Sequence, residues 1–268
     1  MTDTADLPAP QGDPSDGPAI AMRGLGKRFG EVVAVKGIDL DVPRGSFFGL
    51  VGPNGAGKTT TLSMVTGLLR PDAGQAFVLG RDVWADPVAA KGLLGVLPDG
   101  LKLFDRLTGL QLITYAGLLR GMPRDLASER AAELVAALGL AEAKGKLVVD
   151  YSAGMTKKVT LASALVHGPR VLVLDEPFEA VDPISAATIR RILTGFVESG
   201  GTVILSSHVM DLVERTCTHV AVISDGLVLA AGELGVVREG RSLEERFVDL
   251  VGGSTEVVGL SWLRTSSD

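Results

Sequence analysis

The sequence predicts an α/β fold: a core with a parallel sheet, an N-terminal antiparallel β subdomain and an inserted α-helical subdomain. Apolar runs that suit buried strands alternate with helix-like segments over residues 46–70 and 171–224, as a parallel sheet requires. Alternating apolar and polar residues over 20–42 predict two strands, which residues 76–79 would join in an antiparallel sheet. Over residues 108–140 the apolar residues recur at helical spacing instead.

The stretch at residues 52–60 predicts a phosphate-binding loop. It reads Gly-Pro-Asn-Gly-Ala-Gly-Lys-Thr-Thr and fits the pattern G-x-x-x-x-G-K-[ST]. An apolar strand over residues 46–51 enters the loop, and a helix over residues 60–69 leaves it with its N-terminus toward the anion. Glycines let several backbone N–H groups approach phosphate oxygens closely. The residues assigned here to nucleotide binding are Gly52, Pro53, Asn54, Gly55, Ala56, Gly57, Lys58, Thr59 and Thr60.

This loop predicts a P-loop NTPase with a RecA-like core. Lys58 would reach the β- and γ-phosphates of a nucleoside triphosphate, and the Thr59 hydroxyl would bind Mg²⁺. The alternative, a glycine-rich turn with a chance lysine, does not account for the strand before the loop and the helix after it.

A second motif lies at the end of another apolar strand. The run Val-Leu-Val-Leu at residues 171–174 ends in two adjacent carboxylates, Asp175 and Glu176. A central parallel strand delivers its last side chains to the ligand crevice at the carboxyl edge of the sheet. We expect Asp175 to hold Mg²⁺ and Glu176 to polarise the attacking water. The alternative is an ordinary strand end with solvated acids, which the upstream loop makes the weaker interpretation.

Three further segments follow a fixed order around this strand. Tyr-Ser-Ala-Gly-Met stands at residues 151–155, Ala-Val-Asp-Pro at residues 180–183, and an apolar strand at residues 202–207 ends at His208. With the two motifs above, the set resembles the nucleotide-binding subunit of ABC transporters: Walker A, signature loop, Walker B, D-loop and H-loop. The resemblance covers roughly residues 19–232, and its order and spacing are more specific than any single motif.

The resemblance implies a role for each matching residue. Phe29 matches the aromatic residue that stacks on adenine, and Ser152 and Gly154 match signature positions that contact the γ-phosphate bound on the opposite subunit. Asp182 matches the D-loop aspartate, which connects the two sites of a dimer. His208 matches the switch histidine that contacts the γ-phosphate and helps to position the water. The alternatives are a core aromatic for Phe29, a helix cap for Ser152 with Gly154, and a helix-start residue for His208.

Catalysis is therefore expected from Lys58, Glu176 and His208. The implied mechanism is a head-to-tail dimer that closes over two Mg·ATP. Each ATP is held by Lys58 and Thr59 of one chain and by the signature loop of the other. The partners implied are a second copy or a paired ATPase subunit and an integral membrane permease, which places the chain at the cytoplasmic face of the membrane.

Composition agrees with this interpretation. Of 268 residues, 46% are hydrophobic and 22% charged, which is ordinary for a globular protein. The pI near 5.2 argues against a nucleic-acid partner, which would need a basic face. Cys217 is the one cysteine, so no internal disulfide forms, which fits a reducing cytoplasm. No stretch reaches the about 20 apolar residues of a membrane-spanning helix, so the pore of a transporter would be a separate polypeptide.

The chain divides into three segments on these grounds. Residues 1–18 are acidic and rich in proline, and they are expected to form a disordered tail. Residues 19–232 form the expected ATP-binding domain, with the helical subdomain at about 101–152. Residues 233–268 hold a C-terminal amphipathic helix and a tail.

Two other functions remain open at this level. A soluble ABC ATPase of an assembly complex would use the same site without a pore. A P-loop kinase of small molecules would lack the signature loop and His208. Among transporters, the Tyr-Ser-x-Gly-Met signature and the single short cassette favour the exporter branch, an analogy at the level of the fold. The sequence does not identify the cargo.

The chain departs from the family pattern at two places. The usual signature is Leu-Ser-Gly-Gly-Gln, whereas Tyr151, Ala153 and Met155 stand at three of its positions. After another apolar strand, Asp99 replaces a glutamine that ligates Mg²⁺, so Asp99 joins Thr59 and Asp175 as an expected metal ligand. The alternative for Asp99 is a turn residue before a glycine.

The extra negative charge of Asp99 is expected to make basal hydrolysis slower, or more strictly dependent on Mg²⁺, than a glutamine would. The measurement is the ATPase rate of Asp99→Gln against Mg²⁺ concentration. Unchanged turnover and unchanged Mg²⁺ dependence would contradict this expectation.

Overall fold

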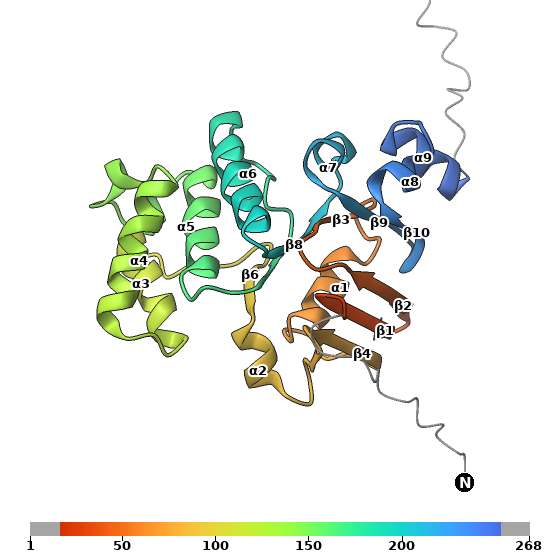
Figure 1. Ribbon diagram of the computed structural model, residues 1–268, viewed down its shortest axis with the longest axis horizontal. Coiled ribbons are helices and arrows are strands. Elements are labelled where there is room, and N and C mark those ends of the chain that lie inside the picture. The colour runs from red at the N-terminus through yellow and green to blue at the C-terminus, as the bar shows by residue number, and fades with distance from the viewer. Residues whose placement is uncertain (1–16, 253–268) are drawn as a thin grey trace, which may run out of the picture.

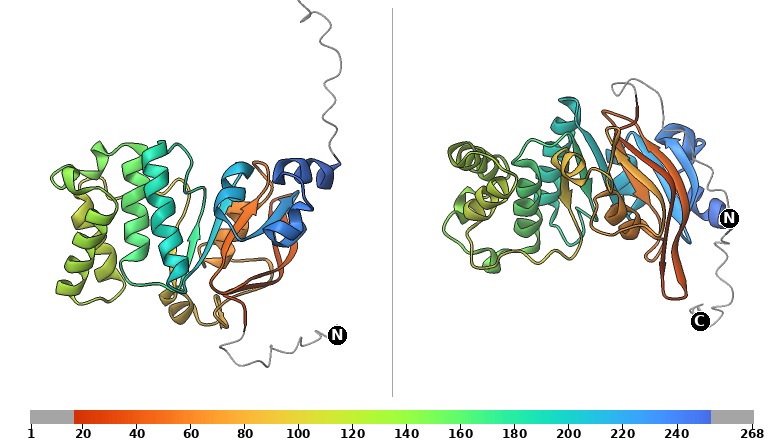
Figure 2. Two further views of the ribbon diagram at one scale, coloured as in Figure 1. Left: turned by 45° about the horizontal axis from the view of Figure 1, so that its top comes forward. Right: turned by 90° about the horizontal axis from the view of Figure 1, so that it is seen from below.

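Figure 1 shows the computed structural model, which describes residues 17–252. A block of helices that includes α3 (Gly109–Leu119) and α4 (Arg124–Ala137) lies at one end of the molecule. The strands β1 (Ile20–Phe29) and β2 (Val32–Val42) lie at the other end, in all the views of Figures 1 and 2. The predicted helical and antiparallel β subdomains are therefore found on opposite sides of a central sheet.

The central sheet has the predicted parallel core. Within the described residues it has the order β10-β9-β3-β8-β7-β6, and every neighbouring pair is parallel except β9 and β10. Every residue of β3, β7 and β8 is buried, as a sheet covered on both faces requires. The strands are β3 (Phe47–Val51), β6 (Leu94–Leu97), β7 (Val171–Leu174), β8 (Thr202–Ser207), β9 (His219–Ser224) and β10 (Leu227–Glu233).

Alternate residues of the central strands belong to two separate cores. Phe48 and Leu50 of β3 pack in one core with the antiparallel sheet, whereas Phe47 and Val51 pack in the other with the helical block. The period-2 alternation of side chains along a strand explains this division. The antiparallel sheet has the order β2-β1-β4-β5 and includes β4 (Ala73–Val78) and β5 (Arg81–Asp82), so the pairing predicted for residues 76–79 is confirmed.

The helices differ from the predicted ranges mainly at their ends. The helix after the phosphate-binding loop, α1, covers Lys58–Val65 rather than residues 60–69, because Gly67 with φ 69° ends it. The long helical stretch is broken into α3 and α4 by Gly121 and Pro123. The remaining helices are α2 (Pro87–Gly92), η1 (Ala141–Ala143), η2 (Val148–Asp150), α5 (Ala153–Leu165), α6 (Pro183–Glu198), α7 (Met210–Thr216), α8 (Leu234–Arg238) and α9 (Leu243–Val251). Helices α2 and α8 were not predicted from the sequence.

The structure describes only part of each end of the chain. The described chain begins at Gly17, which belongs to the predicted tail of residues 1–18. The Gly17 carbonyl accepts a hydrogen bond from Arg44. The rest of that tail and the segment after Gly252 lie outside the described residues.

Cys217 is buried at the end of α7, as expected, and burial raises the pKa of its thiol to about 12. In the described part of the chain, no helix has the length and apolar character to cross a membrane.

Close packing of α7 on the central sheet yields a stability prediction. A Cβ at Gly49, in the middle of β3, would lie 2.5 Å from Cγ1 of Val213 on α7. We expect Gly49→Ala to lower the free energy of unfolding by about 1–3 kcal/mol through overpacking. In a Val213→Ala background the same substitution should cost less, because the clashing methyl groups are gone. Denaturant unfolding of the four proteins measures the coupling, and strictly additive effects would contradict this packing.

Candidate active site

The phosphate-binding loop is held by close backbone contacts that exclude side chains. A Cβ at Gly52 would lie 2.0 Å from the Ile223 carbonyl oxygen, and one at Gly57 would lie 2.6 Å from the Ala34 carbonyl oxygen. Gly57 also has φ 100° and stands at the N-terminus of α1. The loop therefore packs against the backbone of β9 and β2 as it passes from β3 to α1. The first turn of α1 leaves N–H groups free of helical partners for an anion.

Lys58 extends from the first position of α1 back over the loop. Its ammonium donates hydrogen bonds to the carbonyl oxygens of Gly52 at 2.7 Å and Pro53 at 3.1 Å. It also lies 3.8 Å from Glu176 Oε1. Burial lowers the pKa of Lys58, and the nearby carboxylates of Glu176 and Asp175 oppose that shift. A cation held in this position at the loop suits a phosphate ligand.

Asp175 and Glu176 leave the end of β7 in different directions. Asp175 is 5% exposed, and its Oδ1 accepts a hydrogen bond of 2.5 Å from the Ser206 hydroxyl. The same hydroxyl accepts the Glu176 N–H at 2.9 Å. Because β7 pairs in parallel with β8, the end of one strand lies beside the end of the other. Ser206 was not among the predicted site residues, although two serines at the end of an apolar strand at the ligand edge were a signal.

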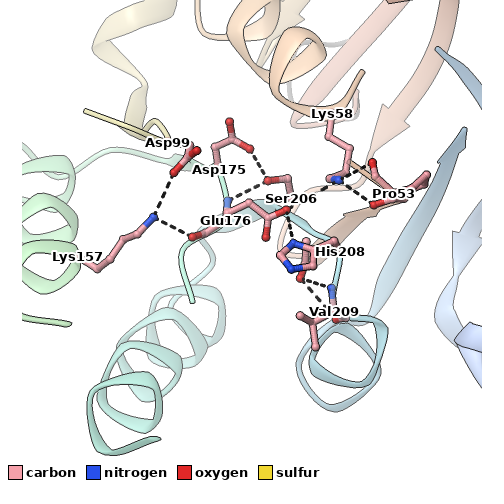
Figure 3. A network of polar contacts seen from close by, with 11 residues as sticks. Pro53, Lys58, Asp99, Lys157, Asp175, Glu176, Ser206, His208 and Val209 are labelled. Atoms are coloured by element: carbon pink, nitrogen blue, oxygen red, sulfur yellow. Dashed lines mark hydrogen bonds and ion pairs between the residues drawn. The ribbon is translucent and has the colours of Figure 1, made fainter. Parts of the chain in front are cut away.

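The carboxylate of Glu176 lies between two of the predicted catalytic residues. Its Oε1 is 3.1 Å from His208 Nδ1 and 3.8 Å from Lys58 Nζ (Figure 3). The backbone of Glu176 adopts φ 45°, in the left-handed region. The structure therefore brings Lys58, Glu176 and His208 together, where the ends of β7 and β8 meet the start of α1.

Asp99 reaches this edge from β6, but it is paired with a lysine. The Asp175 N–H donates to the Leu97 carbonyl oxygen, which places the end of β6 beside the end of β7. Asp99 Oδ1 lies 3.7 Å from Lys157 Nζ, which also donates to the Glu176 carbonyl oxygen at 2.9 Å (Figure 3). Lys157 was also missed, although it follows the signature motif on the same helix. Its charge offsets the negative charge on which the expectation for Asp99 was based.

Oxygen donors of the kind that Mg²⁺ prefers are present at this edge. The Thr59 side chain is exposed beside the loop, and the buried Asp175 carboxylate stands at the end of β7. Mg²⁺ is usually held by one or two protein oxygens together with phosphates and water. Thr59 and Asp175 fit that requirement.

The signature and D-loop residues begin two neighbouring helices. Ser152 caps α5, and its hydroxyl accepts the Met155 N–H at 3.3 Å. In the single chain Ser152 therefore acts as a helix cap. Ala153 is the first residue of α5 and has an ordinary backbone angle there. A Cβ at Gly154 would lie 2.8 Å from Asp182 Oδ2, which explains the glycine. Asp182 caps α6, and the hydrogen bond from the Ser185 N–H lowers its pKa.

Phe29 is available for stacking. Its side chain is 49% exposed at the end of β1, and Lys27 Nζ lies 5.7 Å from the ring centre. The alternative of a core aromatic is therefore wrong for Phe29.

Ser206 organises both carboxyl residues, so its removal has a predicted effect on stability. We expect Ser206→Ala to lower the free energy of unfolding by about 1–3 kcal/mol for each buried group left without a partner, Asp175 Oδ1 and the Glu176 N–H. Ser207→Ala is the matched control, because the Ser207 hydroxyl accepts the Val209 N–H and bonds to neither carboxyl residue. Equal losses from the two substitutions, measured by denaturant unfolding, would contradict the role of Ser206.

Comparison with known proteins identifies the family. The profile of the ABC transporter family matches residues 35–179. The chain is 38% identical over 220 residues to the daunorubicin/doxorubicin resistance ATP-binding protein DrrA of Streptomyces peucetius, covering 82% of this chain and 67% of that protein. It is 36% identical over 206 residues to the linearmycin resistance ATP-binding protein LnrL of Bacillus subtilis (strain 168), covering 77% of this chain and 66% of that protein. The chain thus spans about two thirds of the length of these relatives.

A solved structure described as the ATP-binding subunit of an ABC transporter superposes with a TM-score of 0.80. Its sequence is 25% identical, and the match covers 87% of this chain and 99% of that one. The fold and the ordered site agree with this match. The chain therefore belongs to the ABC transporter family, as one of its ATP-binding subunits, and it is an ABC-type ATPase.

Proposed function

We propose that this chain binds Mg·ATP at the loop of residues 52–57, hydrolyses it at Glu176, and thereby drives export through a separate membrane permease. The observation that supports ATP hydrolysis most directly is the position of the Glu176 carboxylate. Its Oε1 lies 3.8 Å from Lys58 Nζ and 3.1 Å from His208 Nδ1. A phosphate-binding cation, a carboxylate base and a histidine at one sheet edge suit phosphoryl transfer, which needs positioning and charge more than covalent chemistry.

The residues divide the work of hydrolysis among them. The loop N–H groups and Lys58 hold the phosphates, and the Glu176 carboxylate accepts a proton from the attacking water. His208 contacts the same carboxylate oxygen and orients it toward the γ-phosphate. Thr59 and Asp175 would hold Mg²⁺, and a bound Mg²⁺ neutralises charge on the β- and γ-phosphate oxygens.

A second copy of the chain would complete each site. The loop residues Pro53, Asn54 and Gly55 are exposed, so a nucleotide bound there needs a second surface to exclude water. Ser152 is exposed at the start of α5, where it is free to face another chain. This arrangement is the head-to-tail dimer that the resemblance implies, with the exposed Ser152 and Asp182 facing the opposite site and Gly154 buried against the start of α6. In the same proposal Phe29 stacks on the adenine ring.

An apolar groove on the helical block is the proposed contact with the permease. It is lined by residues of α3, the loop before it and the first turns of α4, and its apolar members are Phe104, Leu107, Leu110, Tyr115 and Leu118. The Phe104 side chain is 60% exposed and meets the Tyr115 ring edge to face at 5.7 Å between ring centres. Exposed apolar surface of this kind marks a protein interface.

The cargo is proposed only as a class. The relatives are described as resistance proteins for daunorubicin, doxorubicin and linearmycin and as a Nod factor export protein. By analogy, the cargo is an organic natural product that leaves the cell, and the chain works at the cytoplasmic face of the membrane. The alternative is a soluble ATPase of an assembly complex, in which the groove binds another partner.

Removal of the base should separate binding from turnover. We expect Glu176→Gln to keep ATP binding and to lower turnover by a factor of about 100 or more, since a general base contributes a factor of roughly 10²–10⁴. Size-exclusion chromatography with Mg·ATP should show a trapped dimer. Glu179→Gln, which changes an exposed carboxylate three residues away, is the control and should hydrolyse ATP normally. Normal turnover by Glu176→Gln would show that Glu176 is not the base.

The groove should decide whether the chain associates with membranes. In the native host, tagged chain recovered from detergent-solubilised membranes should carry a stoichiometric polytopic protein. We expect Phe104→Glu to abolish this co-purification and to leave basal ATPase activity unchanged. Val236→Glu is the control, because Val236 is 69% exposed on α8, at the end of the molecule away from the groove. Recovery of the unmodified chain from the soluble fraction alone would favour the assembly alternative.

A further inference from the structure

Lys157 links three parts of the active site. It lies in the second turn of α5, and its side chain, 18% exposed, extends to the carboxyl edge of the central sheet. Its ammonium donates to the Glu176 carbonyl oxygen at 2.9 Å and lies 3.7 Å from Asp99 Oδ1 (Figure 3). The signature helix, the end of β6 and Glu176 are therefore joined through one side chain.

The contact with Glu176 acts on a strained backbone. A non-glycine residue in the left-handed region is disfavoured and persists where the surroundings hold it. At Glu176, with φ 45°, the Ser206 hydroxyl accepts the N–H and the Lys157 ammonium donates to the carbonyl. The carbonyl also accepts the Glu179 N–H at 3.3 Å, a longer contact than the one from Lys157. These contacts fix the peptide groups on both sides of the Glu176 Cα. They therefore determine where its carboxylate points.

Asp99 gives Lys157 a defined position. A carboxylate attracts an ammonium by charge, which the glutamine expected from the family pattern does not. The Asp99 side chain is 48% exposed, and an ion pair of that exposure adds little to stability. Its effect is the orientation of Lys157 toward the Glu176 carbonyl.

We propose that Lys157 is a positioning residue for hydrolysis: Asp99 orients its ammonium, and the ammonium holds the Glu176 backbone so that the carboxylate faces His208 and the γ-phosphate. The proposal rests on the proposed ATPase function. In this arrangement the Asp99 carboxylate serves Lys157 rather than a metal ion.

The first experiment compares purified Lys157→Met, Lys157→Arg and Lys146→Met with the unmodified chain. Lys146 is an exposed lysine in the segment between η1 and η2, which makes it a matched control. The readouts are kcat and KM for ATP, affinity for a fluorescent ATP analogue, and Tm.

We expect Lys157→Met to lower kcat roughly tenfold or more, because a misplaced Glu176 carboxylate aligns poorly with the attacking water. KM and the affinity for the analogue should change by less than about twofold, and Tm should change by no more than a few degrees. Lys157→Arg should restore most of the activity, and Lys146→Met should have no effect. Unchanged kcat in Lys157→Met, or an equal loss of analogue affinity, would overturn the proposal. An unmodified chain that binds no ATP analogue and hydrolyses no ATP would instead refute the proposed function.

A second experiment tests the part played by Asp99. We expect Asp99→Asn to lower kcat when Lys157 is present and to have no further effect in a Lys157→Met background. The Mg²⁺ concentration at half-maximal activity should not change. A rise in that concentration in both backgrounds, or faster turnover in Asp99→Asn, would overturn the pairing and support the metal-ligand role expected from the sequence.

Discussion

The left-handed backbone at Glu176 is the constraint on which the active site depends. Successive side chains of an extended strand point to opposite faces of the sheet, so two adjacent carboxylates would normally diverge. Asp175 keeps its place in the sheet edge and is buried, whereas the turn at Glu176 directs the next carboxylate toward Lys58 and His208. Such a backbone costs about 1–3 kcal/mol and needs contacts that hold it. Ser206 provides one of them on the N–H side.

The rest of the fold supplies rigid positions for those contacts. The central strands are buried on both faces, and their alternate residues belong to separate cores, so each strand end is fixed from two sides. Loops at the carboxyl edge of such a scaffold can carry chemistry without disturbing the core. Because α5 contributes Lys157 to this edge and is capped by Ser152, a movement of the helical block that displaced α5 would reach the Glu176 backbone directly.

Much of this architecture could be predicted from the sequence, because it depends on local patterns. Apolar runs predicted the central strands, and the rule that parallel strands end at the ligand edge of a sheet placed Asp175 and Glu176 there. The phosphate-binding pattern predicted Lys58, whereas the role of His208 was implied by the resemblance to ABC transporter subunits. The contacts made by Ser206 and Lys157 could not be predicted in the same way, since they depend on which strands and helices become neighbours. Short elements such as α2 and α8 carry too few residues to show a period. The observed helix ends differ from the predicted ones where a glycine with positive φ ends the helix, as Gly67 does after α1.

The most direct test is a structure of the Glu176→Gln chain with Mg·ATP. We expect the phosphates to lie on the loop at residues 52–57 and the Lys58 ammonium to leave the loop carbonyls for the phosphates. The side chain at position 176 should face a water in line with the γ-phosphate, while Ser206 and Lys157 still hold its backbone. A nucleotide bound elsewhere, or a residue 176 that has left the left-handed region and turned away from the γ-phosphate, would contradict the account.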